Sequence, residues 1–195
     1  MHSGSQVPPE LGGVIRKVRG SEVECARAHL LRLDADRRRL RFGHDVGDDY
    51  VANYALSVVA PGNLAFGCFN DGHMHALAEL RQPAGAWGIE AEAAFSVERK
   101  FANKGLATVM MGRIICSARN RGVRRLYLYC LADNAKMQAI AAKYRAELKF
   151  EDGSVIADIA PTRPDCYSMA QEFVDDRVGY VHSVLDYQSR RLRPN

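Results

Sequence analysis

The sequence lacks any uninterrupted apolar run of the ~18–20 residues that would cross a membrane, although 47% of its 195 residues are hydrophobic. It also lacks a secretory signal, because "MHSGSQVPPELGG" has no charged start followed by an apolar core. We therefore expect a chain that does not bind membranes, with residues 1–18 as a flexible leader and residues 19–195 as a single domain.

Closely spaced cysteine pairs are absent too. The chain has five cysteines, an odd number, and none of them forms a C-x-x-C motif. A zinc site or a disulfide framework is therefore not expected, and reduced thiols favour a cytoplasmic location. His73 and His75 share a strand face, but no third ligand stands at a suitable spacing. The sequence predicts no metal site.

A strong charge of one sign is missing as well, since 27 basic and 23 acidic residues leave a net charge of +4. The densest basic stretch is "DRRRLRF" at residues 36–42, which follows Asp34 and is interrupted by Leu40. Its arginines are not interleaved with aromatic side chains that could stack on bases. We interpret it as a solvated helix end and rank nucleic-acid binding last among the candidate functions.

The hydrophobic pattern predicts alternating blocks of strands and helices. Apolar residues at three- and four-residue steps indicate helices over residues 21–33, 49–59, 106–120, 133–148 and 165–191. Strand-like runs occupy residues 63–69, 73–82, 89–97, 123–131 and 148–160, with hairpin turns at "NDG" and "EDG". Antiparallel strands followed by a strand–helix–strand unit predict an α/β protein whose mixed sheet carries helices on its faces.

One turn is suited to binding an anion. In "RKFANKGLATVMM", residues 99–111, a strand gives way to a helix through a glycine turn. The unpaired N–H groups of a helix start and the positive end of its dipole favour phosphate. Gly105 allows close approach of the backbone, Lys104 adds a charge, and Thr108 a hydroxyl. Neither a G-x-x-x-x-G-K-[ST] loop nor a G-x-G-x-x-G fingerprint is present, so spacing alone favours a plain turn.

The stretch from "AEAAFSV" to "DNAKM", residues 91–137, resembles the core of the GNAT superfamily of acetyl-CoA-dependent N-acetyltransferases. The family's pyrophosphate motif, [Gln/Arg]-x-x-Gly-x-[Gly/Ala], falls on residues 102–107. The "AE-x-A-F-x-V" strand and the "DN-x-x-M" helix start are most similar to bacterial protein-lysine acetyltransferase domains. The resemblance covers roughly residues 20–160 and implies a mostly antiparallel central sheet, splayed at its middle strands, with helices on both faces.

The resemblance also implies a site for acetyl-CoA. Backbone groups of Phe95, Ser96 and Val97, freed by a bulge in the central strand, would bind the pantetheine arm and the acetyl carbonyl. Asn134 would bridge to the same arm, and Met137 would line its channel. Asn134 also suits a helix N-cap, which is compatible with that role, and Met137 suits an ordinary core. The pyrophosphate would lie on Ala102, Asn103, Lys104, Gly105, Leu106, Ala107 and Thr108.

Two carboxylates are candidates for the proton transfer. A lysine ammonium has a pKa of about 10.4, so a base or a water chain must take its proton before attack. Successive side chains of a strand point to opposite faces, so Glu90 and Glu92 lie on the same face of the strand over residues 89–97. By the resemblance Glu92 is the base and Glu90 the reserve. The alternatives are a solvated strand face or pairing with Arg81 across the hairpin.

Two positions depart from the family pattern. Ala102 stands where the motif has Gln or Arg, and Ala141 where many relatives carry a tyrosine that protonates the leaving thiolate. Tyr144, three residues on, either substitutes for it or packs. The resemblance implies acetyl transfer from acetyl-CoA to a primary amine, on a protein lysine or a small molecule, by direct attack in a ternary complex. The departures leave open a CoA-binding regulatory module without turnover, and the long C-terminal helix leaves open a homodimer.

Overall fold

The computed structural model describes residues 13–83 and 88–192. Within them the strands form one sheet in the order β1-β2-β3-β4-β5-β7-β6. Neighbouring strands are antiparallel except β4 and β5, which are parallel, so the predicted mixed sheet is confirmed. The strands are β1 (Val14–Lys17), β2 (Leu64–Asn70), β3 (His73–Arg81), β4 (Glu90–Val97), β5 (Arg125–Leu131), β6 (Glu147–Glu151) and β7 (Ser154–Ile159).

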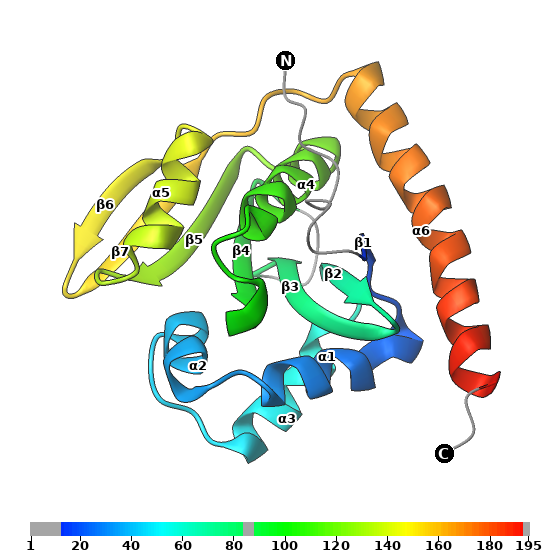
Figure 1. Cartoon of the computed structure of the whole chain (residues 1–195). Helices are drawn as coiled ribbons and strands as arrows, with labels where there is room; N and C mark the ends of the chain where they lie inside the picture. The colour runs from blue at the N-terminus through cyan, green and yellow to red at the C-terminus, as the bar shows by residue number, and fades with distance from the viewer. Residues whose placement is uncertain (1–12, 84–87, 193–195) are drawn as a thin grey trace.

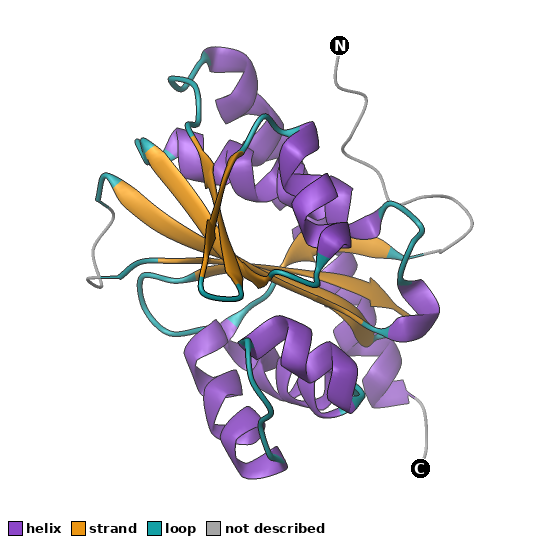
Figure 2. Ribbon diagram, turned by 90° about the vertical axis from the view of Figure 1, so that its left-hand side faces the viewer, coloured by secondary structure: helices purple, strands orange, loops and turns teal. Residues whose placement is uncertain are grey.

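Helices cover both faces of this sheet, as predicted (Figures 1 and 2). On one face α4 supplies Met110, Met111 and Ile114 to the larger apolar core, and on the other face α1 and α3 enclose a second core with residues such as Leu30 and Val51. The helices are α1 (Val23–Leu31), α2 (Ala35–Phe42), α3 (Asp48–Val58), α4 (Leu106–Asn120), α5 (Ala135–Lys143) and α6 (Cys166–Leu192).

The sheet opens between its two parallel strands. β4 and β5 pair only over Glu90–Glu92 and Arg125–Tyr127, although β4 continues to Val97 and β5 to Leu131. Figure 2 shows the strands fanning apart in two directions. The expected splay is therefore present, but its expected cause is wrong. β4 keeps a regular register with β3 from Ala76↔Val97 to Arg81↔Glu92, so the opening comes from divergence of β5 and not from a bulge in β4.

Two expectations about the N-terminal part need correction. Val14–Lys17, inside the expected leader, pairs with β2 as an edge strand, and residues 1–12 lie outside the described residues. The basic stretch at residues 36–42 forms most of α2, but it is not wholly solvated, because the Arg41 side chain is only 7% exposed and pairs with Glu79 of β3. Local sequence patterns cannot show which carboxylate a distant strand brings to an arginine.

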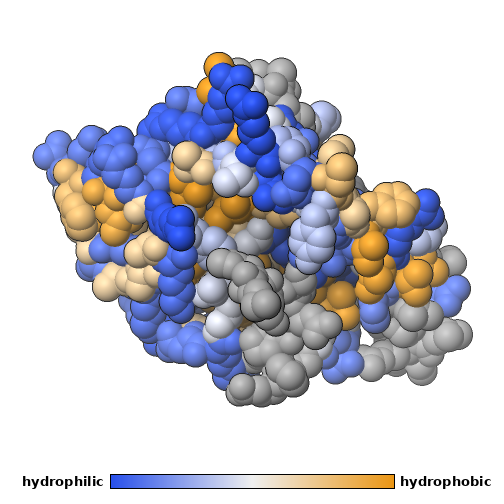
Figure 3. All heavy atoms as spheres, turned by 90° about the horizontal axis from the view of Figure 1, so that it is seen from above, coloured by the Kyte–Doolittle hydropathy of each residue, from blue (hydrophilic) through white to orange (hydrophobic). Residues whose placement is uncertain are grey.

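The last helix, α6, packs along β1 and α4. Lys17 on β1 pairs with Glu172 at 3.1 Å and Asp176 at 2.6 Å, and Arg113 on α4 pairs with Asp175 at 3.4 Å. The outer face of α6 exposes large apolar side chains, including Phe173, Val174, Val178 and Val181. In Figure 3, where α6 lies on the right as in Figure 1, hydrophobic residues are visible on that side. None of the described helices is long and apolar enough to span a bilayer.

Candidate active site

A groove of about 620 Å³ opens where β4 and β5 diverge. Its walls are the end of β4, the turn before α4, and the starts of α4 and α5. Lys104, in the same turn, is exposed and does not line the groove. All the other residues expected to bind acetyl-CoA line it together: Phe95, Ser96, Val97, Ala102, Asn103, Gly105, Leu106, Ala107, Thr108, Asn134 and Met137.

The turn before α4 has the geometry of an anion site. Asn103 and Gly105 have φ values of 62° and 78°, in the left-handed region, and Gly105 is the N-cap of the 15-residue helix α4. The first-turn amides of that helix have no intrahelical acceptor, and the dipole adds positive potential. Ala102 contributes no polar side chain, so the turn can hold a pyrophosphate mainly through backbone N–H groups.

The pairing of β4 with β3 determines which backbone N–H and C=O groups of β4 remain free to bind a ligand. Glu98 N–H donates to the His75 carbonyl at 3.0 Å. Because bonded and non-bonded pairs alternate along antiparallel strands, Ser96 also faces β3, whereas the N–H and C=O groups of Phe95 and Val97 point toward the gap left by β5. The Ser96 hydroxyl lies 2.9 Å from Nε2 of buried His29. Of the three predicted residues, only Phe95 and Val97 offer backbone groups to the groove.

The start of α5 forms the opposite wall. Asn134 is its N-cap, and its Oδ1 accepts from the Met137 N–H at 3.2 Å. This capping bond leaves the Nδ2 donor of Asn134 without an acceptor among the described residues, so capping and ligand binding are compatible. Met137 is half-buried and packs against the core while lining the groove.

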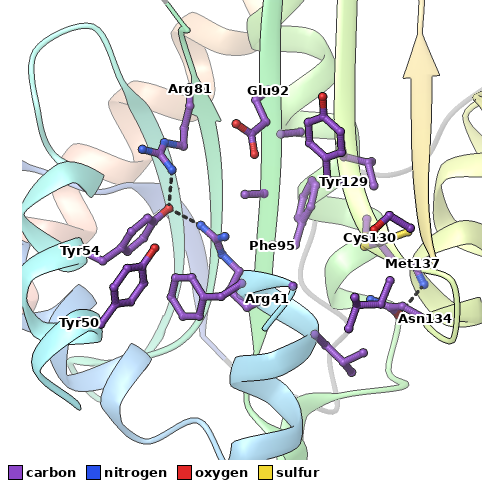
Figure 4. Close-up of a pocket in the computed structure, with 18 residues that line it drawn as sticks. Arg41, Tyr50, Tyr54, Arg81, Glu92, Phe95, Tyr129, Cys130, Asn134 and Met137 are labelled. Carbon is purple, nitrogen blue, oxygen red and sulfur yellow. Dashed lines mark hydrogen bonds between the residues drawn. The ribbon is translucent and has the colours of Figure 1, made fainter. Parts of the chain in front are cut away.

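A second cavity, of about 300 Å³, adjoins the groove and contains Glu92 (Figure 4). Glu92 is half-buried, and no described residue forms an ion pair or hydrogen bond with it. Glu90 is 49% exposed, pairs with Arg125 at 3.2 Å and lies outside this cavity. Of the two candidate bases, only Glu92 therefore lies in the cavity that adjoins the groove. The two cavities share Leu40, Arg41, Phe95, Asn134 and Met137, so they lie side by side.

A polar network that we did not predict from the sequence backs this cavity. Arg41 forms a buried ion pair with Glu79, and their side chains are 7% and 2% exposed. The Tyr54 hydroxyl accepts from Arg41, donates to Glu79 at 2.9 Å, and accepts from Arg81 at 3.0 Å. Burial and the Glu79 charge raise the pKa of Tyr54, which therefore stays protonated. The available signal was Glu79 itself, because a carboxylate in an apolar strand needs a partner.

Tyr144 lies elsewhere. It caps the C-terminal end of α5, and its hydroxyl donates to the Thr108 carbonyl at 2.7 Å. Burial raises its pKa, and it lines neither cavity. Ala141, at the family tyrosine's position, is fully buried in the core. The structure thus places Tyr144 as a contact between α5 and α4 and does not bring it to the site.

The turn before α4 is anchored by a charged cluster. Glu98 accepts hydrogen bonds from His29 at 3.2 Å, His75 at 3.1 Å and Arg32 at 2.8 Å. Burial alone would raise the pKa of Glu98, but these bonds outweigh it and lower that pKa to about 2. His75 also stacks on Phe101 with ring centroids 4.1 Å apart. Within the described residues no group of three or more His, Cys, Asp or Glu side chains is arranged to hold a metal.

Comparison with known proteins agrees with this geometry. The chain is similar in structure to the GNAT domain of S. lividans PAT (21% identity, TM-score 0.64, 75% of this chain and 89% of that chain). It is also similar to the ribosomal-protein-S18-alanine N-acetyltransferase from Escherichia coli (18%, 0.60, 80% and 97%). A cAMP-binding acyltransferase from Mycobacterium smegmatis matches as well (21%, 0.53, 81% and 48%), and the chain spans about half of that protein's length.

At these identities the structural matches establish the fold alone. The family model described as "Acetyltransferase (GNAT) family" matches residues 29–145, more than half of the chain. The matched segment includes the turn at Gly105, Glu92 on β4 and the Asn134 cap of α5. The chain therefore belongs to the GNAT family of acetyltransferases.

Proposed function

We propose that this chain transfers an acetyl group from acetyl-CoA to a primary amine, on a protein lysine or a small molecule, by direct attack in a ternary complex. The observation that carries the proposal is the meeting of two cavities at the point where β4 and β5 diverge. One is a groove that begins at the α4 N-terminus, and the other contains Glu92, a carboxylate that forms no ion pair with any described residue.

The groove suits acetyl-CoA along its whole length. The α4 turn would hold the pyrophosphate, and the free N–H and C=O groups of Phe95 and Val97 would bind the pantetheine arm as a missing neighbour strand would. Lys136 and Lys143 line the groove and add positive charge for the nucleotide phosphates. A volume of about 620 Å³ lies within the usual range for small-molecule sites.

In this proposal Glu92 takes the proton from the acceptor ammonium, either directly or through a water. The free amine then attacks the thioester carbonyl, whose oxygen gains negative charge that a β4 backbone N–H can stabilise. The thiol of CoA has a pKa near that of cysteine, about 8.5, so its thiolate can leave without a dedicated acid. Tyr144 is not required. The proton on Glu92 is returned to solvent or to the departing thiolate.

A thiol-release assay with acetyl-CoA and a panel of amines and lysine peptides tests this function. Release with at least one acceptor, together with mass-spectrometric detection of its acetylated product, is the expected result. Binding of acetyl-CoA without release on any acceptor would instead favour the CoA-binding regulatory module that Ala102 and Ala141 leave open. Failure to bind acetyl-CoA would remove the basis of both functions. The reduced cysteines and this cofactor fit the proposed cytoplasmic location.

We also propose a homodimer through the outer face of α6. This face exposes the large apolar side chains of Phe173, Val174, Val178 and Val181. A twofold axis would place this face of two copies together, so that the exposed apolar side chains of each are buried against those of the other. Sedimentation should give a dimer for the native chain and a monomer for Val174→Lys. A native monomer at micromolar concentration would overturn the proposal.

A further inference from the structure

We propose that the acceptor carries an anionic group, such as a carboxylate, close to its reactive amine, and that Arg81 binds this group while Glu92 receives the amine. The inference rests on the proposed function and names the acceptor class. A free amino acid and a lysine beside an acidic residue in a peptide share this chemistry.

Arg81 and Glu92 lie close enough together to bind an anion and an ammonium of the same acceptor. Arg81 and Glu92 face each other in the register of β3 and β4, and both line the cavity. Directly opposed residues on antiparallel strands have Cα atoms about 5.5 Å apart or less, so the two side chains leave one face of the sheet side by side. They nevertheless form no ion pair. Figure 4 shows the Arg81 guanidinium turned toward Tyr54, away from the Glu92 carboxylate.

Tyr54 holds Arg81 in that position. Its hydroxyl accepts from Arg81 Nη1 at 3.0 Å, and the guanidinium carbon lies 5.1 Å from the centre of the Tyr54 ring. Both contacts leave the charge of Arg81 uncompensated, because Tyr54 is neutral. A guanidinium has five N–H donors and prefers to engage a carboxylate through two of them. Arg81 therefore keeps unused donors for a bound anion.

The charges that line the cavity support the same conclusion. They are Arg41, Arg81 and Glu92. Arg41 is neutralised by Glu79 in a buried ion pair. Among the described residues this leaves one cation and one carboxylate without an oppositely charged partner. An ammonium and an anion on the same small molecule or peptide segment would satisfy both.

This charge pattern also disfavours other acceptors. A polyamine, or a lysine flanked by basic residues, would bring a second cation next to Arg81, and the repulsion is stronger in a half-buried cavity than in water. A neutral monoamine would satisfy Glu92 and leave Arg81 unpaired. The expected order of preference is anionic, then neutral, then cationic acceptors.

The test compares kcat/KM for three lysine peptides that differ only in having Asp, Gln or Lys on either side of the reactive lysine. A parallel arm compares a free amino acid, its amide and a diamine, and shows whether the anion comes from a peptide or a small molecule. The native protein should prefer the anionic member of one arm over the neutral member by about tenfold or more, a typical effect of a charged hydrogen bond.

Arg81→Gln keeps a donor for Tyr54 but removes the charge, so the ratio of kcat/KM between anionic and neutral acceptors should fall to about one, chiefly through KM. Arg81→Lys should restore part of the ratio. Arg124→Gln, an exposed arginine outside both cavities, is the matched control and should keep the native ratio. Melting temperatures and acetyl-CoA affinity, measured for every variant, separate this effect from misfolding.

Equal use of anionic and neutral acceptors by the native protein would overturn the inference, as would an unchanged ratio in Arg81→Gln. Either result would leave the proposed acetyl transfer intact, because turnover is still observed. If no acceptor is turned over, the proposed function fails instead. Calorimetric binding of the same acceptors to the protein saturated with CoA then decides the inference by itself, since it needs no turnover.

Discussion

Arg81 and Glu92 are partners in the β3–β4 register, yet Arg81 donates to Tyr54 of α3 at 3.0 Å and not to Glu92. Two opposite charges on neighbouring strands thus form no ion pair, and Arg81 is instead held by a tyrosine from a helix. Glu92 is therefore a half-buried carboxylate that no cation of the described residues contacts, beside the groove that we assign to acetyl-CoA.

The buried ion pair behind the cavity should be strongly coupled. Removing one partner of a buried pair leaves an uncompensated charge, so Arg41→Met or Glu79→Gln alone should lower the free energy of unfolding by about 3–5 kcal/mol. The double variant should lose clearly less than the sum of the two single losses. Urea denaturation of the four proteins measures this coupling. Strictly additive losses would show that the two side chains do not stabilise each other.

Tyr144→Phe should separate packing from acid catalysis. The variant loses the hydrogen bond to the Thr108 carbonyl, so we expect a loss of about 1 kcal/mol in unfolding free energy with kcat changed less than twofold. If Tyr144 were the acid for the leaving thiolate, kcat would fall by about 10²–10⁴. Thiol release at saturating acetyl-CoA distinguishes the two cases.

Gly105→Ala should weaken acetyl-CoA binding. Gly105 has a φ of 78°, and an L-residue there costs about 1–2 kcal/mol. The turn can avoid this cost by changing its backbone conformation, but its N–H groups would then no longer be positioned to bind the pyrophosphate. The Kd for acetyl-CoA, measured by calorimetry, should therefore rise about tenfold. Gly153→Ala is the matched control, because Gly153 has a φ of 80° in the β6–β7 turn, outside both cavities. Equal Kd values for the two variants would contradict the assignment.

The Glu98 cluster predicts a dependence of stability on pH. The pKa of Glu98 is lowered from an ordinary 4.5 to about 2 in the folded protein, so the unfolded chain binds the proton more tightly. This contribution to stability is present above about pH 4.5 and is lost as the pH falls toward 2. Glu98→Gln should be less stable at pH 7 and lose less stability over that acid range. The exposed Glu151→Gln control should follow the native curve.

The outline of the fold was predictable because its elements are locally encoded. The predicted helix over residues 106–120 matches α4, whose apolar positions recur on one face and which follows a glycine N-cap. The hairpin turn at Asp71 and Gly72 was predictable because both residues tolerate positive φ, which they adopt. β1 was not predictable, since four residues of an edge strand leave little periodicity and depend on pairing with β2.

The candidate site was also predictable from the sequence only in part. The residues of the turn before α4 and the Asn134 N-cap belong to short sequence motifs, so we could predict from the sequence that they contribute to the acetyl-CoA site. The network of Arg41, Tyr54 and Glu79 could not, because it joins α2, α3 and β3 through tertiary packing. The backbone direction of Ser96 was likewise set by pairing with β3, which residue type alone does not reveal.

The role of Glu92 as the base is tested most directly by the pH dependence of thiol release, measured with one accepted amine for the native protein, Glu92→Gln and Glu90→Gln. Glu90 shares the strand face but lies outside the cavity and pairs with Arg125. We expect thiol release to rise with pH in the native protein and in Glu90→Gln, and kcat near neutral pH to fall by about 10²–10⁴ in Glu92→Gln. Native rates in Glu92→Gln, or an equal loss in Glu90→Gln, would contradict this role of Glu92.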